Sequence, residues 1–517
     1  MYHHPGEYLT DFCVVEHQGL YHLFHIRGER WTWPLGYREL DLGHAVSKDL
    51  RTWTPLDPVV PAGDPGAWDV AGVWAPDVIE ADGLFHLFYT GSDAANNQAI
   101  GLATSPDLHT WTKFPENPVV TPGPWSDRAL GRDVAGRDAM VLRDEVRARY
   151  LLYYTATMAD GRACLALAES TDLRQWRDLG PTLIEDDRSY NRLESAYVVA
   201  HEGRYYLFYS AKGGPNSEGF APGDFAHFDI VYVVSDRPDG GWAKPANHQL
   251  LADWTCASEH PTFGDQTYMF YVIQEEVAGR WGASRLSDPK RIHWRSDGLV
   301  EIHEHRPAGL DERVLFDSAH DSVDDWYSHG AGPRDGWQQD ADGVIHAPQA
   351  VGEHALVAPL WGKDFAMRVQ VRGDSGDEPG EEASLLLYTN PSAMAGYRVA
   401  VAWPAGTLRL YRKIPGRPDE LLQSRPLENT GDGWHQLAAT VEDGVIEVYF
   451  DHALQIVRHD TVYSEGGFGL QCRGPAAFRH LRVTQSPPSL PSPPAWDRRV
   501  TPRHLMSSRQ AATPPRE

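Results

Sequence analysis

Three acidic residues recur in similar sequence surroundings. Asp11, Asp138 and Glu194 each stand at or near the start of an apolar stretch that leads into a strand rich in aromatic residues. Glycoside hydrolysis ordinarily needs two carboxyl groups, one protonated as the acid and the other ionised as nucleophile or base. If the fold brings the three residues together, we expect Glu194 to be the acid, because its longer side chain can reach a leaving group. Asp11 suits the nucleophile or base.

The third acid follows an arginine, and this pairing defines its expected role. Arg137 should keep Asp138 ionised, so that Asp138 could hold sugar hydroxyl groups and bias the protonation of its neighbour. Crowding of the acids should raise the pKa of one of them, as a general acid requires. Gly131-Arg-Asp133 nearly duplicates Gly136-Arg-Asp138. Only Asp138 directly precedes an apolar strand, and it is therefore the residue predicted to act. A single acid at a strand end is usually a turn residue, but three in one repeat favour a joint function.

Three further residues complete the predicted site. Trp74 either stacks on a sugar ring or fills the space between repeats, and His260 either binds a water or ion or is a buried, hydrogen-bonded histidine. Asp77 is interpreted as structural. Arg137, Trp74 and His260 are therefore the predicted substrate-binding residues. No metal ligand set and no cofactor are predicted.

The acids belong to a repeat with five copies. In each copy an apolar stretch and a turn precede an aromatic strand, and these strands begin at Tyr21, Phe85, Tyr150, Tyr205 and Tyr268. The segment Gly43 to Trp53 recurs as Gly101 to Trp111 and Leu167 to Trp176, with fainter copies ending at Trp242 and Trp294. A period of about 60 residues exceeds the ~50 of kelch and the ~40–45 of WD40 repeats. Four short strands per period predict a five-bladed β-propeller, whose innermost strands converge on one axis. The regular tryptophans indicate packing between blades.

The remainder of the chain predicts an all-β protein with a second domain. Residues 1–300 are assigned to the propeller, and residues 311–485 contain many short apolar strands separated by polar turns, which predict a β-sandwich. Residues 486–517 are rich in Pro, Ser and Arg and are predicted to be disordered.

Composition excludes several classes of function. A net charge of −25 opposes binding to nucleic acid phosphates. The four cysteines are scattered and form no C-x-x-C pair, which indicates free thiols rather than a disulfide framework or zinc site. We find no signal sequence and no run near the ~18 apolar residues of a membrane span, so a cytoplasmic protein is expected. The expected partner is a carbohydrate substrate, without nucleic acid or membrane, and the oligomeric state stays open.

These motifs resemble the five-bladed propeller glycosidases of glycoside hydrolase families 32 and 43. The Gly43 to Trp53 stretch is similar to the first blade of family 32, the fructofuranosidases, and Trp74 to Val78 to the second blade of family 43, the arabinofuranosidases and xylosidases. The resemblance implies that Asp11 is the first-blade acid, Asp138 the Arg-Asp acid and Glu194 the acid/base. Gly466 to Cys472 and Phe478 to Val483 resemble concanavalin-like sandwiches, some of which bind fructans beside family 32 catalytic domains.

The chain also departs from family 32. That family has Asn-Asp-Pro-Asn-Gly where Leu9 to Cys13 stands, Arg-Asp-Pro where Arg137-Asp-Ala139 stands, and Glu-Cys where Glu194-Ser195 stands. The leading hypothesis is a retaining, β-fructofuranosidase-like hydrolase, with the carboxyl groups of Asp11 and Glu194 ~5–5.5 Å apart. An inverting arabinofuranosidase or xylosidase would need ~6.5–9.5 Å. A non-catalytic sugar-binding propeller is the second alternative.

Overall fold

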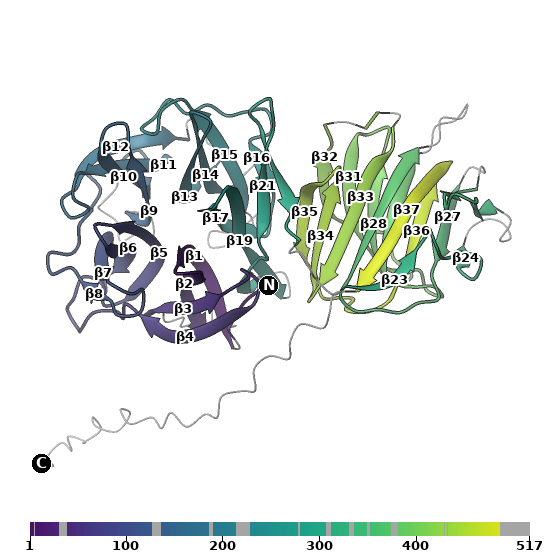
Figure 1. Ribbon diagram of the computed structural model, residues 1–517, viewed down its shortest axis with the longest axis horizontal. Helices are drawn as coiled ribbons and strands as arrows, with labels where there is room; N and C mark the ends of the chain where they lie inside the picture. Colours follow the sequence, from purple (N-terminus) through teal and green to yellow (C-terminus); the bar gives the residue numbers. More distant parts are fainter. Residues whose placement is uncertain are drawn as a thin grey trace, which may run out of the picture.

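The computed structural model consists of two β-rich lobes (Figure 1). It describes residues 1–4, 6–29, 39–126, 136–185, 190–213, 228–277, 280–306, 312–329, 336–348, 352–373, 381–428, 430–431 and 433–485. The duplicated Gly131-Arg-Asp133 and the tail 486–517 lie outside these residues. The all-β fold predicted from the sequence is confirmed.

The first lobe is the five-bladed propeller. Blades 1 to 4 are antiparallel four-stranded sheets whose strands follow one another in chain order. Their strands are β1 (Glu7–His17), β2 (Leu20–Glu29), β3 (Leu42–Ser47) and β4 (Trp53–Val59); β5 (Gly72–Ala81), β6 (Leu84–Ser92), β7 (Gln98–Ser105) and β8 (Thr112–Lys113); β9 (Arg137–Asp144), β10 (Arg149–Thr157), β11 (Ala163–Ser170) and β12 (Arg177–Ile184); β13 (Arg192–His201), β14 (Arg204–Lys212), β15 (Phe228–Ser235) and β16 (Gln249–Leu251).

Blade 5 closes the ring and continues into the second lobe. It contains β17 (Thr255–Glu259), β18 (Thr262–Phe263), β19 (Gln266–Val277) and β20 (Arg280–Leu286), followed by β21 (Lys290–Trp294) and β22 (Val300–Glu304). Tyr2 pairs with Leu286 through two backbone hydrogen bonds of 3.1 and 2.8 Å, which joins the start of the chain to blade 5. The circle of blades is thus closed by main-chain pairing.

The repeated tryptophans pack between blades, as the sequence predicts. Trp111 of blade 2 meets Phe24 of blade 1 edge-on, and Trp176 of blade 3 meets Phe88 of blade 2 in the same way, both with ring centroids 5.6 Å apart. Each indole also donates a 3.1 Å hydrogen bond to the carbonyl of the leucine three residues earlier. Each repeat in the sequence therefore corresponds to one blade that packs on the blade before it.

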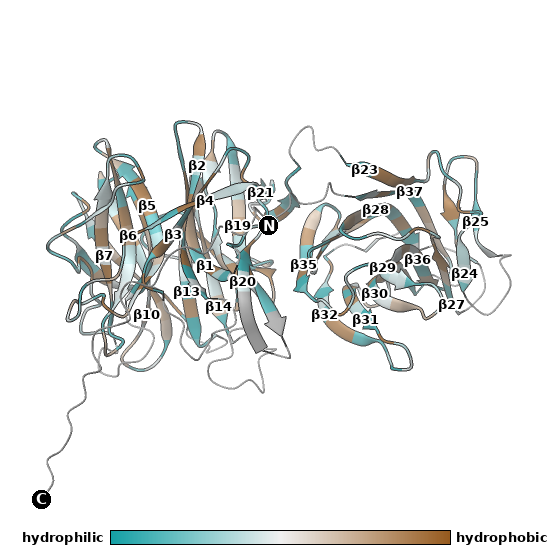
Figure 2. Cartoon of the chain, turned by 90° about the horizontal axis from the view of Figure 1, so that it is seen from below, coloured by the Kyte–Doolittle hydropathy of each residue, from teal (hydrophilic) through white to brown (hydrophobic). Residues whose placement is uncertain are grey.

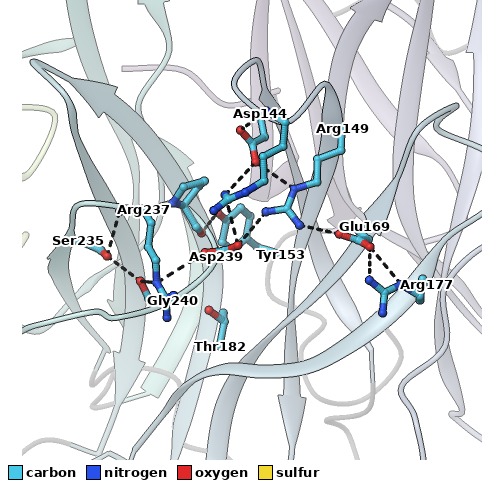
Figure 3. Close-up of polar contacts among 12 residues, drawn as sticks. Asp144, Arg149, Tyr153, Glu169, Arg177, Thr182, Ser235, Arg237, Asp239 and Gly240 are labelled. Carbon is cyan, nitrogen blue, oxygen red and sulfur yellow. Dashed lines mark hydrogen bonds and ion pairs between the residues drawn. The ribbon is translucent and has the colours of Figure 1, made fainter.

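A polar network fastens blade 3 to blade 4 (Figure 3). Arg149 contacts three carboxylates, those of Asp144 at 2.9 Å, Glu169 at 2.6 Å and Asp239 at 2.7 Å. Asp239 lies in the turn of blade 4, whereas the other two belong to blade 3. A guanidinium presents a planar fork of donors, so one arginine can serve three acceptors at once.

The second lobe is a sandwich of two antiparallel sheets. One sheet contains β23 (Arg313–Asp317), β25 (Gln338–Gln339), β26 (Ile345–His346), β28 (Phe365–Gly373), β33 (His435–Glu442), β34 (Val445–Phe450), β35 (Ala453–His459) and β37 (Ala476–Gln485). The other contains β24 (Tyr327–His329), β27 (Glu353–Val357), β29 (Glu382–Asn390), β30 (Ala395–Ala402), β31 (Thr407–Lys413), β32 (Glu420–Pro426) and β36 (Gly467–Arg473). Buried side chains from both sheets form one core.

The two lobes are joined by apolar and polar contacts. Ile292 and Ile302 of the propeller share a buried cluster with Tyr449 and Leu454 of the sandwich. Arg425 donates two 2.9 Å hydrogen bonds to the Gln249 side chain and carbonyl. In Figure 2, apolar segments run along strands of both lobes. The part of the chain that the structure describes has no helix with the length and apolarity of a membrane span.

Candidate active site

The innermost strand of every blade is interrupted at the same level by a β-bulge. A non-glycine residue with positive φ lies in each bulge: Asp11 (23°), Ala75 (43°), Asp138 (55°), Ser195 (52°) and Ala257 (46°). This left-handed conformation is unfavourable for L-residues and concentrates at functional sites. A bulge also bends the strand and redirects its side chains. Five such bulges form a ring of equivalent positions around the axis.

Ser195 is the residue through which the two aspartates are connected. Its hydroxyl group donates a 2.8 Å hydrogen bond to Oδ1 of Asp11, and its backbone N–H donates a 3.4 Å bond to Oδ2 of Asp138. The same Oδ2 accepts a 3.1 Å bond from the Thr155 hydroxyl. The backbone N–H of Asp138 donates to the hydroxyl of Thr90 at 3.0 Å, which anchors the bulge to blade 2. Blades 1, 3 and 4 therefore meet at Ser195.

Arg137 connects the two remaining functional strands. It lies directly before the bulge of β9, and Glu194 lies directly before the bulge of β13. Nη2 of Arg137 donates to Oε1 of Glu194, while Nε lies 3.4 Å from Oδ2 of Asp138. Nη1 of Arg192 lies 3.4 Å from the same Glu194 oxygen. The structure thus brings Asp11, Asp138, Glu194 and Arg137 into one contiguous cluster.

The electrostatics of the cluster differ from the sequence expectation. Burial, followed by the charges of Asp138 and Glu194, raises the pKa of Asp11 to about 7. Burial likewise raises the pKa of Asp138, against the opposing effect of Arg137. Burial would raise the pKa of Glu194 too, but Arg137, Arg192 and Lys212 together lower it below the ordinary value. Crowding therefore shifts the proton toward the aspartates and leaves Glu194 ionised.

Trp74 occupies the position in blade 2 that Arg137 and Glu194 occupy in blades 3 and 4. It is half-buried, and its indole lies against the backbone of Gly72, where an added Cβ would meet the ring at 2.7 Å. Asp77, two residues after the bulge residue Ala75, is buried and accepts a 2.8 Å hydrogen bond from the Val141 backbone N–H. That bond joins blades 2 and 3, in agreement with the structural role expected for Asp77. The role of Trp74 toward a sugar stays a prediction.

His260 lies directly after the inner strand of blade 5 and not at its start. That strand begins earlier, at β17, and its bulge residue is Ala257. His260 comes three residues later, where the other blades have Val14, Val78, Val141 and Val198. Its ring is 1% exposed, lies 3.8 Å from the Phe208 ring and 3.0 Å from the Ser258 hydroxyl, and burial lowers its pKa to about 3. These contacts are those of a buried, hydrogen-bonded histidine, one of the two roles expected for it, and its role toward a sugar stays a prediction.

Sequence reasoning missed the contributors that carry no charge. Ser195, Thr155 and Gln98 were not proposed, although Gln98 receives a 3.5 Å contact from Nη1 of Arg137. Aligning the five inner strands on Asp11 and Asp138 would have placed Ser195 at the equivalent position. Among the described residues, the three axial acids do not belong to a group with metal-ligand spacing.

Comparisons with known proteins agree with this arrangement. The model of the glycosyl hydrolases family 32 N-terminal domain matches residues 12–195, and that of glycosyl hydrolases family 43 matches residues 134–257. Levanase of Bacillus sp. (strain L7) is 30% identical over 272 residues, which cover 47% of this chain and 26% of that protein. The insoluble β-fructofuranosidase isoenzyme CWINV5 of Arabidopsis thaliana is 37% identical over 119 residues, 21% of this chain and 19% of that protein. The matched regions thus span about a quarter or less of these two relatives.

The resemblance to the propeller glycosidases of families 32 and 43 is confirmed. Solved structures extend the likeness in fold to both lobes. Exo-inulinase from Aspergillus awamori superposes with a TM-score of 0.67 at 14% identity, covering 94% of this chain and 97% of that one. Fructan 1-exohydrolase IIa from Cichorium intybus gives 0.66 at 14% identity, covering 94% and 96%. The propeller followed by a sandwich is therefore a shared architecture.

Proposed function

We propose that this chain is a glycoside hydrolase of the β-fructofuranosidase type, which cleaves furanosidic bonds of oligo- or polysaccharides. The observation that carries the proposal is the cluster of three carboxylates from blades 1, 3 and 4, joined by Ser195 and Arg137 at one level of the propeller axis. Left-handed backbone and shifted pKa values occur together there, as is typical of active sites. The family 32 match, which spans Asp138 and Glu194, supports the same reading.

The proposed roles follow from the geometry of each carboxylate. Asp11, held by the Ser195 hydroxyl, is the nucleophile that forms a bond to the anomeric carbon. Glu194 gives a proton to the leaving oxygen and afterwards takes one from the attacking water. Asp138, fixed by Thr155 and Ser195, is the acceptor for hydroxyl groups of the sugar.

Catalysis by this route needs a proton to be redistributed when substrate binds. In the free site the pKa of Asp11 is raised and that of Glu194 is lowered, whereas retaining hydrolysis starts with Asp11 ionised and Glu194 protonated. Sugar hydroxyls that donate to Asp11 would favour its ionised form, and a sugar that draws Arg137 away from Glu194 would favour the protonated form there. We therefore expect Arg137 to change partners on substrate binding.

The direct test is Glu194→Gln assayed on sucrose, inulin, levan and aryl arabinofuranosides. We expect turnover to fall at least about a hundredfold, the usual scale for the loss of general acid catalysis. Glu202→Gln is the matched control, because Glu202 lies exposed in the turn after the same strand. Full activity in Glu194→Gln would contradict the assigned role. Sugar binding without hydrolysis of any substrate by the unchanged protein would indicate a non-catalytic binding propeller instead.

The second candidate is an inverting arabinofuranosidase or xylosidase. It is favoured by the family 43 match over residues 134–257 and by the Trp74 to Val78 sequence. The two candidates differ in stereochemistry, because a covalent intermediate on Asp11 yields a product of retained configuration. NMR of the first anomer released separates them. An inverted anomer, or release of arabinose without fructose, would move the assignment to the family 43 type.

A further inference from the structure

The hairpin of β21 and β22 carries two histidines and a glutamate on one face. In the register of this antiparallel pair His293 lies directly opposite Glu301, and His303 follows two residues along the same strand. Side chains two apart share a face of a strand. The intervening Ile302 and its partner Ile292 point the other way, into the core, with exposures of 1% and 4%. The sheet pleat thus presents three donor groups together at the surface.

The ring nitrogens of the two histidines and the carboxylate oxygens of Glu301 lie close to one another. Nε2 of His303 lies 3.0 Å from Oε2 of Glu301, and the rings of His293 and His303 are stacked with centroids 4.4 Å apart and planes 14° from parallel. One ligand atom from each of the three residues lies within 4.8 Å of the other two. Two imidazoles and a carboxylate are ligands that zinc and similar divalent ions accept in a tetrahedral site completed by water.

A second layer of contacts orients the carboxylate. Nη1 of Arg295 lies 3.1 Å from Oε1 of Glu301, which leaves Oε2 facing His303. Arg295 is itself held by Asp297 at 2.7 Å and by Glu428 of the sandwich at 3.0 Å. Such outer contacts fix ligand orientation in metal sites. An ordinary surface ion pair of Glu301 and His303 contributes little to stability and needs neither His293 nor these outer contacts.

We propose that His293, Glu301 and His303 form a binding site for a divalent transition-metal ion of the zinc type. The site lies where the lobes join, because His303 is the residue of β22 that pairs with Ala453 of β35. His303 also borders a cavity of ≈ 160 Å³ at this junction. An ion bound here ties the hairpin together at the point where the propeller sheet continues into the sandwich. Its role is structural and independent of the proposed hydrolytic activity.

The test is titration of the full-length, chelator-treated protein with Zn²⁺ by calorimetry, with Co²⁺ absorption as a report on coordination. We expect one Zn²⁺ per chain, and binding weakened at least about 10–100-fold in both His293→Ala and His303→Ala, because the loss of an outer contact to a ligand already costs this much. The matched control is His346→Ala, because His346 has a carboxylate partner, Asp340 at 3.2 Å, but belongs to no three-ligand group among the described residues. Zn²⁺ should raise the midpoint of thermal unfolding in the wild type and in this control, but not in the other two variants.

Two outcomes would overturn the site. One is the absence of one-to-one binding tighter than about 0.1 mM, the range of weak association. The other is an affinity that His293→Ala leaves unchanged, which would place any bound Zn²⁺ elsewhere. Because His293 is exposed, that variant should fold, and equal unfolding midpoints of variant and wild type in the presence of chelator verify this.

Discussion

Replacement of Asp11 by asparagine should stabilise the protein, and by more at high pH than at low pH. The pKa of Asp11 is about 7 in the folded protein, whereas the ordinary value for an aspartate is 3.8. A carboxyl group with a raised pKa makes the folded state bind more protons than the unfolded state, so stability falls as pH rises from about 4 to about 7. Asparagine has no charge to bury and can still accept the Ser195 hydrogen bond. The penalty should therefore disappear in Asp11→Asn.

The magnitude follows from the size of the shift. A difference of about three pKa units corresponds to about 4 kcal/mol at 1.36 kcal/mol per unit. Asp11 is not fully buried, so solvent screening reduces the expected gain to about 2–4 kcal/mol at pH 8. At pH 5 only about one of these three pKa units has been passed, because the unfolded state ionises above pH 3.8, so the same reasoning gives a gain of about 1–1.5 kcal/mol there. The gain is thus a difference between two pH values, not a uniform effect.

Thermal and urea unfolding, followed by tryptophan fluorescence at pH 5 and pH 8, measure this difference. Asp265→Asn provides the control, because Asp265 lies exposed in a turn of blade 5 and should show no such pH-dependent gain. The reasoning is refuted if Asp11→Asn is no more stable than the wild type at pH 8. It is equally refuted if the gain is the same at both pH values, because the effect would then not come from the Asp11 charge.

Two further substitutions probe the site and its frame. Ser195→Ala removes a hydrogen bond that lowers the pKa of Asp11, and a hydrogen bond to a charged group contributes ~1.5–3 kcal/mol. The acidic limb of the pH profile of kcat/KM should therefore move up by about 1–2 pH units. An unchanged acidic limb would show that ionisation of Asp11 does not control the rate. Arg149→Met should lower the free energy of unfolding by about 3 kcal/mol, because it leaves the carboxylates between blades 3 and 4 without their cation. Arg147→Met, at a half-exposed arginine bonded to the same network, should cost under about 1 kcal/mol, and equal unfolding midpoints for the two variants would count against this account.

The fold could be predicted from the sequence because each blade repeats one packing unit. The Asp-Leu turn and its tryptophan mark the unit, and Trp111 and Trp176 do pack on the preceding blade. Blade 5 departs from the repeat, because His260 takes a position held by valine in the other blades. The sequence left two roles open for this histidine, and its contacts with the rings of Phe208 and Tyr197 depend on blade packing that a residue type does not reveal.

Less of the site than of the fold could be foreseen. The acids could be chosen from their place in the repeat, but their protonation depends on where a flexible side chain points. Arg137 directly precedes Asp138 in the sequence, yet its guanidinium also contacts Glu194 across the interface between blades 3 and 4. That contact between residues 57 positions apart reverses the expected order of pKa values. A local sequence pattern does not contain it.

The ring of bulges constrains which acid can perform which task. Residues within the bulges adopt left-handed φ, a region that aspartate and asparagine enter more readily than longer or β-branched side chains. The five occupants, Asp11, Ala75, Asp138, Ser195 and Ala257, all have short side chains. Glu194 stands one residue earlier, outside the left-handed region, where a longer side chain meets no such restriction. Main-chain geometry thus selects aspartate for the short-reach role and glutamate for the long-reach one, and redesign at Ala75 or Ala257 would succeed most readily with asparagine, aspartate or glycine.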